Sequence, residues 1–255
     1  MNTPFQMPDA SSKDVVLATD LDGTFLGGSE LERDALYATL KANRDKVMLV
    51  FVTGRDIPFI KDLCADGWVP FPDFVIGDVG TTIVGGPDLV PVPELEAEIA
   101  EIWGDAGDRV RDMLSDVPWL ELQPTPFRYR VSYYYNPSKY EPAVARKIEE
   151  AGFDCLTSAD TYFDVLPKGV SKGPTLLRVV DHLKIDGGRV LVAGDTMNDL
   201  SLFETGLRGV AVANSERGLL DRVRGLPNTT IANGNGAAGI HEILSTLTTL
   251  REAAA

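Results

Sequence analysis

The chain has 255 residues, 44% of them hydrophobic, with 24 Gly and 16 Pro, which is typical of a soluble protein with one large domain or a core plus a smaller insertion. Its formal net charge of −14 argues against nucleic acid and anionic membranes as partners, because both attract basic surfaces. No apolar run approaches the roughly 20 residues that span a bilayer, and the opening MNTPFQMPDASSKD lacks the basic start and apolar centre of a signal peptide.

Strands and helices are expected to alternate through the first third of the chain. Near-continuous apolar runs predict buried strands at 14–20, 47–52 and 74–86, the last turning into a hairpin. The stretches between them predict helices at 29–43, with a Ser cap, and at 56–66, with Pro in its first turn. This order is typical of a parallel sheet covered by helices on both faces. The expected fold class is therefore α/β, a doubly wound parallel sheet.

The middle of the chain has a different pattern. A charged helical stretch, ELEAEIAEIWGDAGDRVRDML, precedes an alternating aromatic strand, RYRVSYYYNP, then a helix and a strand pair. Antiparallel strands with helices suit an inserted α+β cap domain, which we expect at 86–163. The core then comprises 1–85 and 164–255. In the second part, the strand–helix pattern resumes with helices at 173–184, 198–206 and 239–251 and strands at 189–195 and 209–214.

Polar side chains gather at the expected ends of the core strands and at a helix start. They occur in four pieces: Asp20-Leu21-Asp22-Gly23-Thr24, Thr53-Gly54-Arg55, Lys172 in GVSKGPT, and Gly194-Asp195-Thr196-Met197-Asn198-Asp199. Ligands of such sheets collect beyond the carboxyl ends of the strands. Carboxylates that converge there repel one another, and Mg²⁺, which prefers oxygen ligands, relieves the repulsion. One carboxylate can then attack phosphorus as a nucleophile.

This set of motifs resembles the haloacid dehalogenase superfamily of phosphohydrolases, whose motifs are DxDxT, a Thr or Ser after the second strand, a Lys, and GDxxND. The resemblance implies that Asp20 is the nucleophile and Asp22 the general acid and base. Phosphate-binding roles fall to Thr53, Gly54, Lys172 and Asn198. The implied cofactor is Mg²⁺, held by Asp20, Asp22 (through its backbone carbonyl), Asp195 and Asp199. Lys168 competes with Lys172 for the third motif, but Lys172 precedes Gly at a helix start and fits better.

The position of the cap, after Thr53-Gly54-Arg55 and a third strand, resembles the Cof-type branch of that superfamily. Several pieces resemble sucrose-phosphate phosphatase and its sugar-phosphatase relatives: GDVGTTI at 77–83, PFRYRVSYY at 126–134, DVLP at 164–167, and the tail pieces VANSERGLLDRV and NGNGAAGIHEIL. Two departures concern the cap side of the site. The relatives usually carry Glu or an equivalent residue where this chain has Thr82, and Lys-Val-Ser where it has Arg130-Val131-Ser132.

The aromatic and basic strand of the cap is the candidate sugar-binding element. Alternation along a strand places Arg128, Arg130 and Ser132 on one face, and Tyr129, Val131 and Tyr133 on the other. Aromatic faces stack on sugars, while Arg and Tyr hydrogen-bond to hydroxyl groups. The cap residues expected to bind substrate are Arg128, Arg130, Ser132 and Tyr133. The alternative is that the tyrosines only pack the cap sheet against its helices.

The function expected from these observations is a Mg²⁺-dependent phosphomonoesterase that acts on a phosphorylated sugar. Sucrose 6-phosphate is favoured by the resemblance, while phosphates of trehalose, glucosylglycerol, mannosyl- or glucosylglycerate and amino sugars remain open. A phosphomutase on the same core and a non-enzymatic phospho-receiver are the alternatives, and the second carboxylate, Asp22, argues against a receiver. Cys64 and Cys155 have no metal-like spacing, which favours free thiols and the cytoplasm. A monomer or small homo-oligomer is expected.

Overall fold

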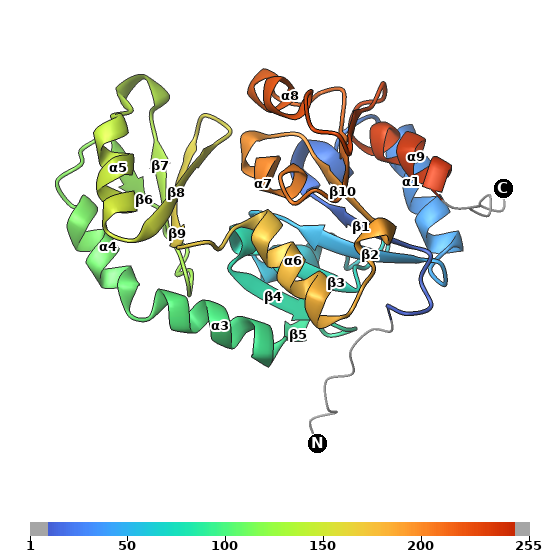
Figure 1. Ribbon diagram of the computed structural model, residues 1–255, viewed down its shortest axis with the longest axis horizontal. Helices are drawn as coiled ribbons and strands as arrows, with labels where there is room; N and C mark the ends of the chain where they lie inside the picture. The colour runs from blue at the N-terminus through green and yellow to red at the C-terminus, as the bar shows by residue number, and fades with distance from the viewer. Residues whose placement is uncertain (1–9, 248–255) are drawn as a thin grey trace.

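Two β-sheets organise residues 10–247, the part of the chain that this computed structural model describes (Figure 1). The first sheet has eight strands in the order β12-β11-β10-β1-β2-β3-β4-β5, and the second has four in the order β6-β7-β9-β8. The second sheet and its helices form the green and yellow lobe of Figure 1, beside the larger first unit. Within residues 10–247, no helix combines the length and apolar character needed to cross a membrane.

The first sheet is parallel from β12 to β3 and ends in an antiparallel edge formed by β4 and β5. Its strands are β1 (Val15–Thr19), β2 (Val47–Val52), β3 (Phe74–Gly77), β4 (Thr82–Gly85), β5 (Val90–Pro91), β10 (Val190–Gly194), β11 (Arg208–Ala211) and β12 (Thr229–Ile231). The predicted α/β doubly wound fold is confirmed, with this hairpin edge added to its parallel part.

Helices cover both faces of the first sheet. One face carries α1 (Glu30–Ala42), α2 (Ile57–Leu63) and α9 (Gly236–Leu247). The other carries α3 (Pro93–Trp103), α6 (Lys172–His182), α7 (Leu200–Phe203) and α8 (Arg217–Val223). Successive side chains of β1 pack into opposite cores, Leu17 beneath α1 and α9, and Val16 beneath α6 and α7. Burial on both faces explains why these strands are apolar at every position.

The second sheet is antiparallel and has one face covered. Its strands are β6 (Leu120–Leu122), β7 (Val131–Tyr135), β8 (Phe153–Ser158) and β9 (Tyr162–Pro167), and its helices are α4 (Ala106–Leu114) and α5 (Pro142–Glu150). Val131, Phe163 and Val165 pack with residues of both helices in a separate hydrophobic core. Side chains at alternate positions, such as Ser132 and Asp164, therefore project from the opposite face, toward the first unit.

Several elements differ from the expected ones. The charged helical stretch breaks at Gly104, whose φ of 57° ends α3, and α3 packs on the first sheet. The aromatic strand begins only at Val131. Helix α8 and strand β12 were not anticipated, and the expected end of the last helix, 248–251, lies outside the described residues.

The strand pairing differs from the expected boundaries of the cap domain. The expected division places 86–163 in the cap, yet β5 pairs with β4 in the first sheet, and β9 continues to Pro167 in the second sheet. Because β5 belongs to the first sheet although it lies inside those boundaries, and β9 belongs to the second sheet although it extends past them, we propose that the second unit extends from about residue 104 to residue 167.

Candidate active site

The stretch that follows β1 forms a tight turn at the carboxyl edge of the first sheet. The N–H of Asp20 donates to the carbonyl of Ala193 on β10, 2.9 Å away, which fixes Asp20 at this edge. The chain then turns over Leu21–Phe25, with Gly23 at φ 80°. A Cβ atom at Gly23 would lie 2.2 Å from Oδ2 of Asp195. Glycine is therefore required both for the backbone angle and for the close approach of that carboxylate.

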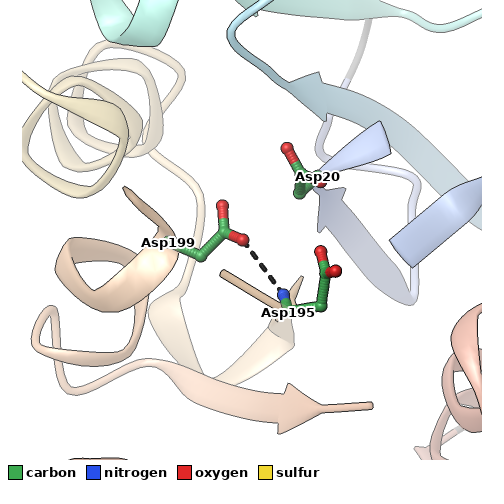
Figure 2. Close-up of side chains that lie close together, drawn as sticks. All are labelled: Asp20, Asp195 and Asp199. Atoms are coloured by element: carbon green, nitrogen blue, oxygen red, sulfur yellow. Dashed lines mark hydrogen bonds between the residues drawn. The ribbon is translucent and has the colours of Figure 1, made fainter. Parts of the chain in front are cut away.

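Three carboxylates meet beside this turn (Figure 2). One oxygen from each of Asp20, Asp195 and Asp199 lies within 4.8 Å of the others, and all three residues are buried. The Oγ1 of Thr24 donates to Asp195 over 2.6 Å. The backbone N–H groups of Asp195 and Thr196 both donate to Oδ2 of Asp199 over 3.0 Å. The carboxylates are thus held in place by neighbouring donors.

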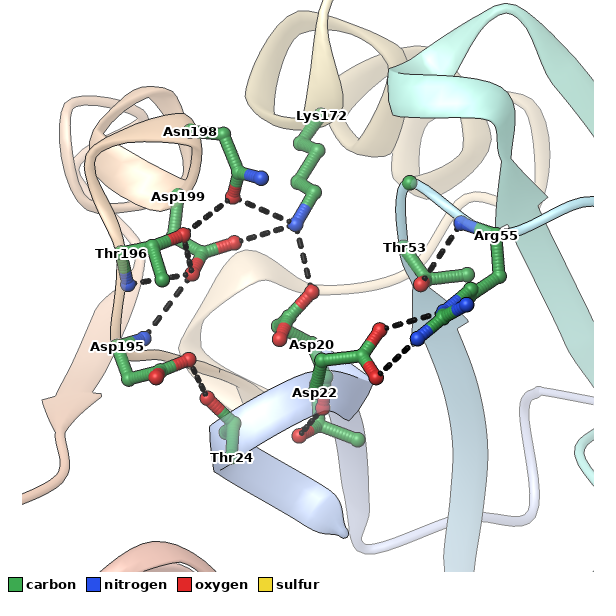
Figure 3. A network of polar contacts seen from close by, with 12 residues as sticks. Asp20, Asp22, Thr24, Thr53, Arg55, Lys172, Asp195, Thr196, Asn198 and Asp199 are labelled. Carbon is green, nitrogen blue, oxygen red and sulfur yellow. Dashed lines mark hydrogen bonds and ion pairs between the residues drawn. The ribbon is translucent and has the colours of Figure 1, made fainter. Parts of the chain in front are cut away.

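Lys172 is the cation of this cluster (Figure 3). Its side chain is fully buried, and its Nζ lies 2.6 Å from Oδ1 of Asp20 and 2.6 Å from Oδ1 of Asp199. It also donates to Oδ1 of Asn198 over 2.9 Å. The alternative, Lys168, is exposed and pairs with Asp154 instead. Of the two lysines that competed for the third motif, the structure brings Lys172 to the carboxylates.

The charge balance of the cluster perturbs its carboxyl groups. Burial is the main cause that raises the pKa of Asp20 well above its usual range, and the Asp199 carboxylate adds to it against the opposing effect of Lys172. Burial likewise raises the pKa of Asp195 to about 7. Burial alone would lower the pKa of Lys172, but Asp199 and Asp20 outweigh it and raise that pKa. The single ammonium of Lys172 therefore does not neutralise the negative charge of three ionised carboxylates.

The acidic cluster fits a hard divalent cation. Its donors are all carboxylate oxygens, the ligand type that Mg²⁺ prefers, and an additional positive charge would offset the cost that raises the pKa values of Asp20 and Asp195. The Asp22 carboxylate does not belong to this group. It faces away, toward the loop after β2 (Figure 3).

Asp22 is bound by an arginine to which the sequence analysis assigned no role. The Nε and Nη2 atoms of Arg55 each donate to a different oxygen of Asp22 over 2.8 Å. Arg55 stands at the end of the Thr53-Gly54-Arg55 motif, and its N–H donates to Oγ1 of Thr53 over 3.1 Å. The position of Arg55 in this motif could have indicated the contact. Arg55 follows β2, Asp22 follows β1, and these two strands are neighbours in the sheet.

The second unit reaches this loop through Arg130. Its Nη2 donates to the carbonyl of Gly54 over 3.1 Å, and its Nη1 lies 3.2 Å from Oδ1 of Asp164 on β9. The hydroxyl of Ser132 donates to the same carboxylate. Asp78, after β3, lies 3.6 Å from Arg130. Asp78 and Asp164 were not among the expected site residues, although both stand in sequence pieces that carried the resemblance.

Two of the expected substrate contacts have partners of their own. Arg128 precedes the strand and pairs with Glu96 of α3 over 2.7 Å. Tyr133 is only 5% exposed and packs edge-on to Phe163 inside the second core. The expectation that Tyr133 binds substrate is corrected: its strand position turns it toward α4 and α5, away from the first unit.

The fold and the cluster define the class of protein first. Over 92% of the chain, the structure superposes on a haloacid dehalogenase-like hydrolase protein of Bacillus subtilis with a TM-score of 0.65 and 19% identity, covering 92% of that chain. It superposes more closely on the sucrose-phosphatase of Synechocystis in complex with sucrose and phosphate, with a TM-score of 0.83 and 24% identity over 92% of this chain and 98% of that one. The fold is therefore that of haloacid dehalogenase-like hydrolases.

The sequence then identifies the family. Residues 13–247 match the model of the sucrose-6F-phosphate phosphohydrolase family, and the chain belongs to that family. A mannosylfructose-phosphate phosphatase of Agrobacterium fabrum is 30% identical over 212 residues, which cover 78% of this chain and 83% of the relative.

Two other relatives are longer than this chain. A glucosylglycerol-phosphate synthase of Pseudomonas anguilliseptica is 41% identical over 229 residues, which cover 89% of this chain but 30% of the relative. Sucrose-phosphatase 2 of Nicotiana tabacum is 32% identical over 251 residues, 90% of this chain and 58% of the relative.

Proposed function

We propose that this chain is a Mg²⁺-dependent phosphomonoesterase that hydrolyses a phosphorylated glycoside through an aspartyl-phosphate on Asp20. The observation that carries the proposal is the convergence of Asp20, Lys172 and the Asp195–Asp199 pair at one edge of the sheet. Such a set provides a nucleophile, a fixed cation and a place for a metal within a few ångströms. Family membership supports the same chemistry.

In the proposed reaction, an Asp20 oxygen attacks phosphorus while the bond from phosphorus to the sugar oxygen breaks. The carboxyl group of Asp22 gives its proton to the leaving oxygen. It then takes a proton from the water that attacks the aspartyl-phosphate, which releases inorganic phosphate and restores Asp20. Asp22 suits this role because it stands two residues after Asp20 and its side chain is half exposed.

Thr53, Gly54, Lys172 and Asn198 are proposed to hold the phosphoryl group. Lys172 and Asn198 already contact each other, and Thr53 lies at the end of the neighbouring strand β2. Asp20, Asp195, Asp199 and the carbonyl of Asp22 would hold Mg²⁺. When bound, Mg²⁺ neutralises the charge of the phosphoryl oxygens as the new bond forms.

A glycoside phosphate is proposed as the substrate class. The relatives named above concern phosphates of sucrose, of mannosylfructose and of glucosylglycerol, which all consist of a sugar joined to a second polyol unit. The Pseudomonas anguilliseptica relative has the highest identity of these, so glucosylglycerol phosphate stands beside sucrose 6-phosphate as a first candidate.

The free thiols Cys64 and Cys155 support the cytoplasm as the location.

A phosphate-release screen tests the proposal. The purified chain is assayed with sucrose 6-phosphate, mannosylfructose phosphate, glucosylglycerol phosphate, trehalose 6-phosphate, glucosamine 6-phosphate and a nucleotide, each with Mg²⁺ or with EDTA. We expect Mg²⁺-dependent release, with the highest kcat/KM for one two-unit glycoside phosphate. Efficient hydrolysis of the nucleotide alone would reject the sugar assignment. Isomerised sugar phosphate without released phosphate would instead favour a phosphomutase.

A further inference from the structure

Two exposed tyrosines stand side by side on the open face of the second sheet. Tyr134 on β7 and Tyr162 on β9 are direct cross-strand partners, and their ring centroids are 6.0 Å apart. They are 40% and 39% exposed, among the largest exposures of aromatic side chains in residues 10–247. Two adjacent exposed rings offer an apolar surface that a ligand can cover.

The strand register shows which way the pair faces. Tyr134 and Tyr162 are each two positions from a residue of the Ser132–Asp164 pair, so all four share one face. That face is the one from which Arg130, bound to Asp164, reaches the carbonyl of Gly54 in the first unit. The opposite face is closed by α4 and α5. The tyrosines therefore face the first unit.

Strand pairing and the position of the β8–β9 turn place the pair beside the candidate active site. Ser158, the partner of Tyr162 on β8, lines a cleft of about 710 Å³ that also has Asn198 in its wall. Figure 1 shows the β8–β9 turn close to α7, the helix that directly follows Asn198 and Asp199 in the chain. The tyrosine pair thus lies one strand away from a wall of this cleft, on the face of the second sheet that is turned toward the first unit.

We propose that Tyr134 and Tyr162 form the platform on which the sugar part of the substrate stacks, and that they determine specificity for a glycoside phosphate over a small phosphorylated compound without a ring. The inference rests on the proposed phosphatase function. Sugar rings present flat C–H surfaces, which aromatic rings cover well, and phenol hydroxyls bind the ring's edge. Two rings side by side offer area for both units of a two-unit glycoside. Asp164 and Ser132, already hydrogen-bonded to each other, form the polar border of this platform.

The test compares two substrates in four variants. Tyr134→Leu and Tyr162→Leu remove the aromatic ring, whereas Tyr134→Phe and Tyr162→Phe keep it. The substrates are the best glycoside phosphate of the screen and acetyl phosphate, which has no ring. Phe71→Leu is the matched control. Phe71 is similarly exposed, but it precedes β3 at the amino edge of the first sheet, whereas the candidate active site lies at the carboxyl edge.

We expect each Leu variant to lower kcat/KM for the glycoside phosphate by about tenfold, mainly through KM. Acetyl phosphate hydrolysis should stay within about twofold, and the Phe variants should keep most of the activity. Equal losses on both substrates, or no loss on either, would overturn the assignment. Calorimetric binding of the unphosphorylated glycoside with inorganic phosphate gives a second readout that needs no turnover, and binding unchanged in the Leu variants would also reject the platform. A wild-type chain that binds the glycoside but releases no phosphate would reject the proposed hydrolase alone.

Discussion

The ammonium of Lys172 lies 2.6 Å from the carboxylate of Asp20, although 152 residues separate them in the chain. The same ammonium lies 2.6 Å from Asp199, so a fully buried lysine joins the end of β1 to the turn after β10. Because a buried ammonium needs anionic partners and buried carboxylates need a cation, neither side of this contact is stable without the other.

Asp20→Asn tests the nucleophile. An amide oxygen cannot attack phosphorus to form a stable acyl phosphate, so we expect kcat to fall by at least about 10³-fold. The amide keeps the size of the side chain and can still accept from Lys172, so the circular dichroism spectrum should be unchanged. Phosphate release is the measurement, and near-normal turnover of this variant would reject Asp20 as the nucleophile.

Lys172→Met tests the charge balance of the cluster. Removing the ammonium leaves Asp20 and Asp199 buried without their cation, and we expect a loss of about 3–5 kcal/mol in the free energy of unfolding. Urea unfolding in EDTA and in Mg²⁺ measures it. If a metal binds the carboxylates, Mg²⁺ should recover part of the loss. Lys168→Met is the control and should unfold like the wild type, because Lys168 is exposed. An equal loss with and without Mg²⁺ would argue against the metal site.

Arg130→Lys tests the link between the two units. The guanidinium reaches Asp164 and the carbonyl of Gly54 at the same time, and a single ammonium cannot span both. We expect a loss of about 1–3 kcal/mol in stability and faster amide hydrogen exchange at Thr53–Arg55. Arg128→Lys is the matched control: Arg128 is half exposed, so its substitution should change little. Similar effects of the two substitutions would contradict a special role for Arg130.

The pH dependence of stability reports on His241. Burial lowers the pKa of this imidazole below its ordinary 6.5, and its Nε2 lies 3.2 Å from Oγ1 of Thr39. The unfolded chain then binds a proton at His241 more readily than the folded chain does. Its contribution to stability is therefore complete above pH 6.5 and is lost as the pH falls below that value.

His241→Gln removes this titration and keeps a hydrogen-bonding side chain. Urea unfolding of both proteins between about pH 5 and 7.5 should show a smaller acid-side decline in the variant. Comparing the two cancels the other titrating groups. Parallel curves would show that His241 is protonated equally in both states.

How much could be predicted from the sequence differs between the two units. In the first, apolar strands interrupted by polar motifs predicted the sheet, and the rule that parallel strands end at one edge predicted that Asp20, Thr53 and Asp195 come together. In the second, alternation predicted two faces but not which one is open. Tyr133 was assigned to the substrate, whereas its neighbour Tyr134 is the exposed residue.

The sequence by itself determined the fold class and the grouping of the core motifs at one edge of the sheet, because both depend on local signals: apolar runs, a glycine turn and the carboxylates at strand ends. Only the tertiary structure decided the partners of Arg130 and Asp22. Arg130 meets Asp164 and Gly54 at separations of 34 and 76 residues, and Asp22 meets Arg55 at 33. Such pairs depend on how the second unit and the loops pack, and charged residues are common enough that spacing alone does not select among them. The open face of the second sheet was decided in the same way, by the side on which α4 and α5 pack.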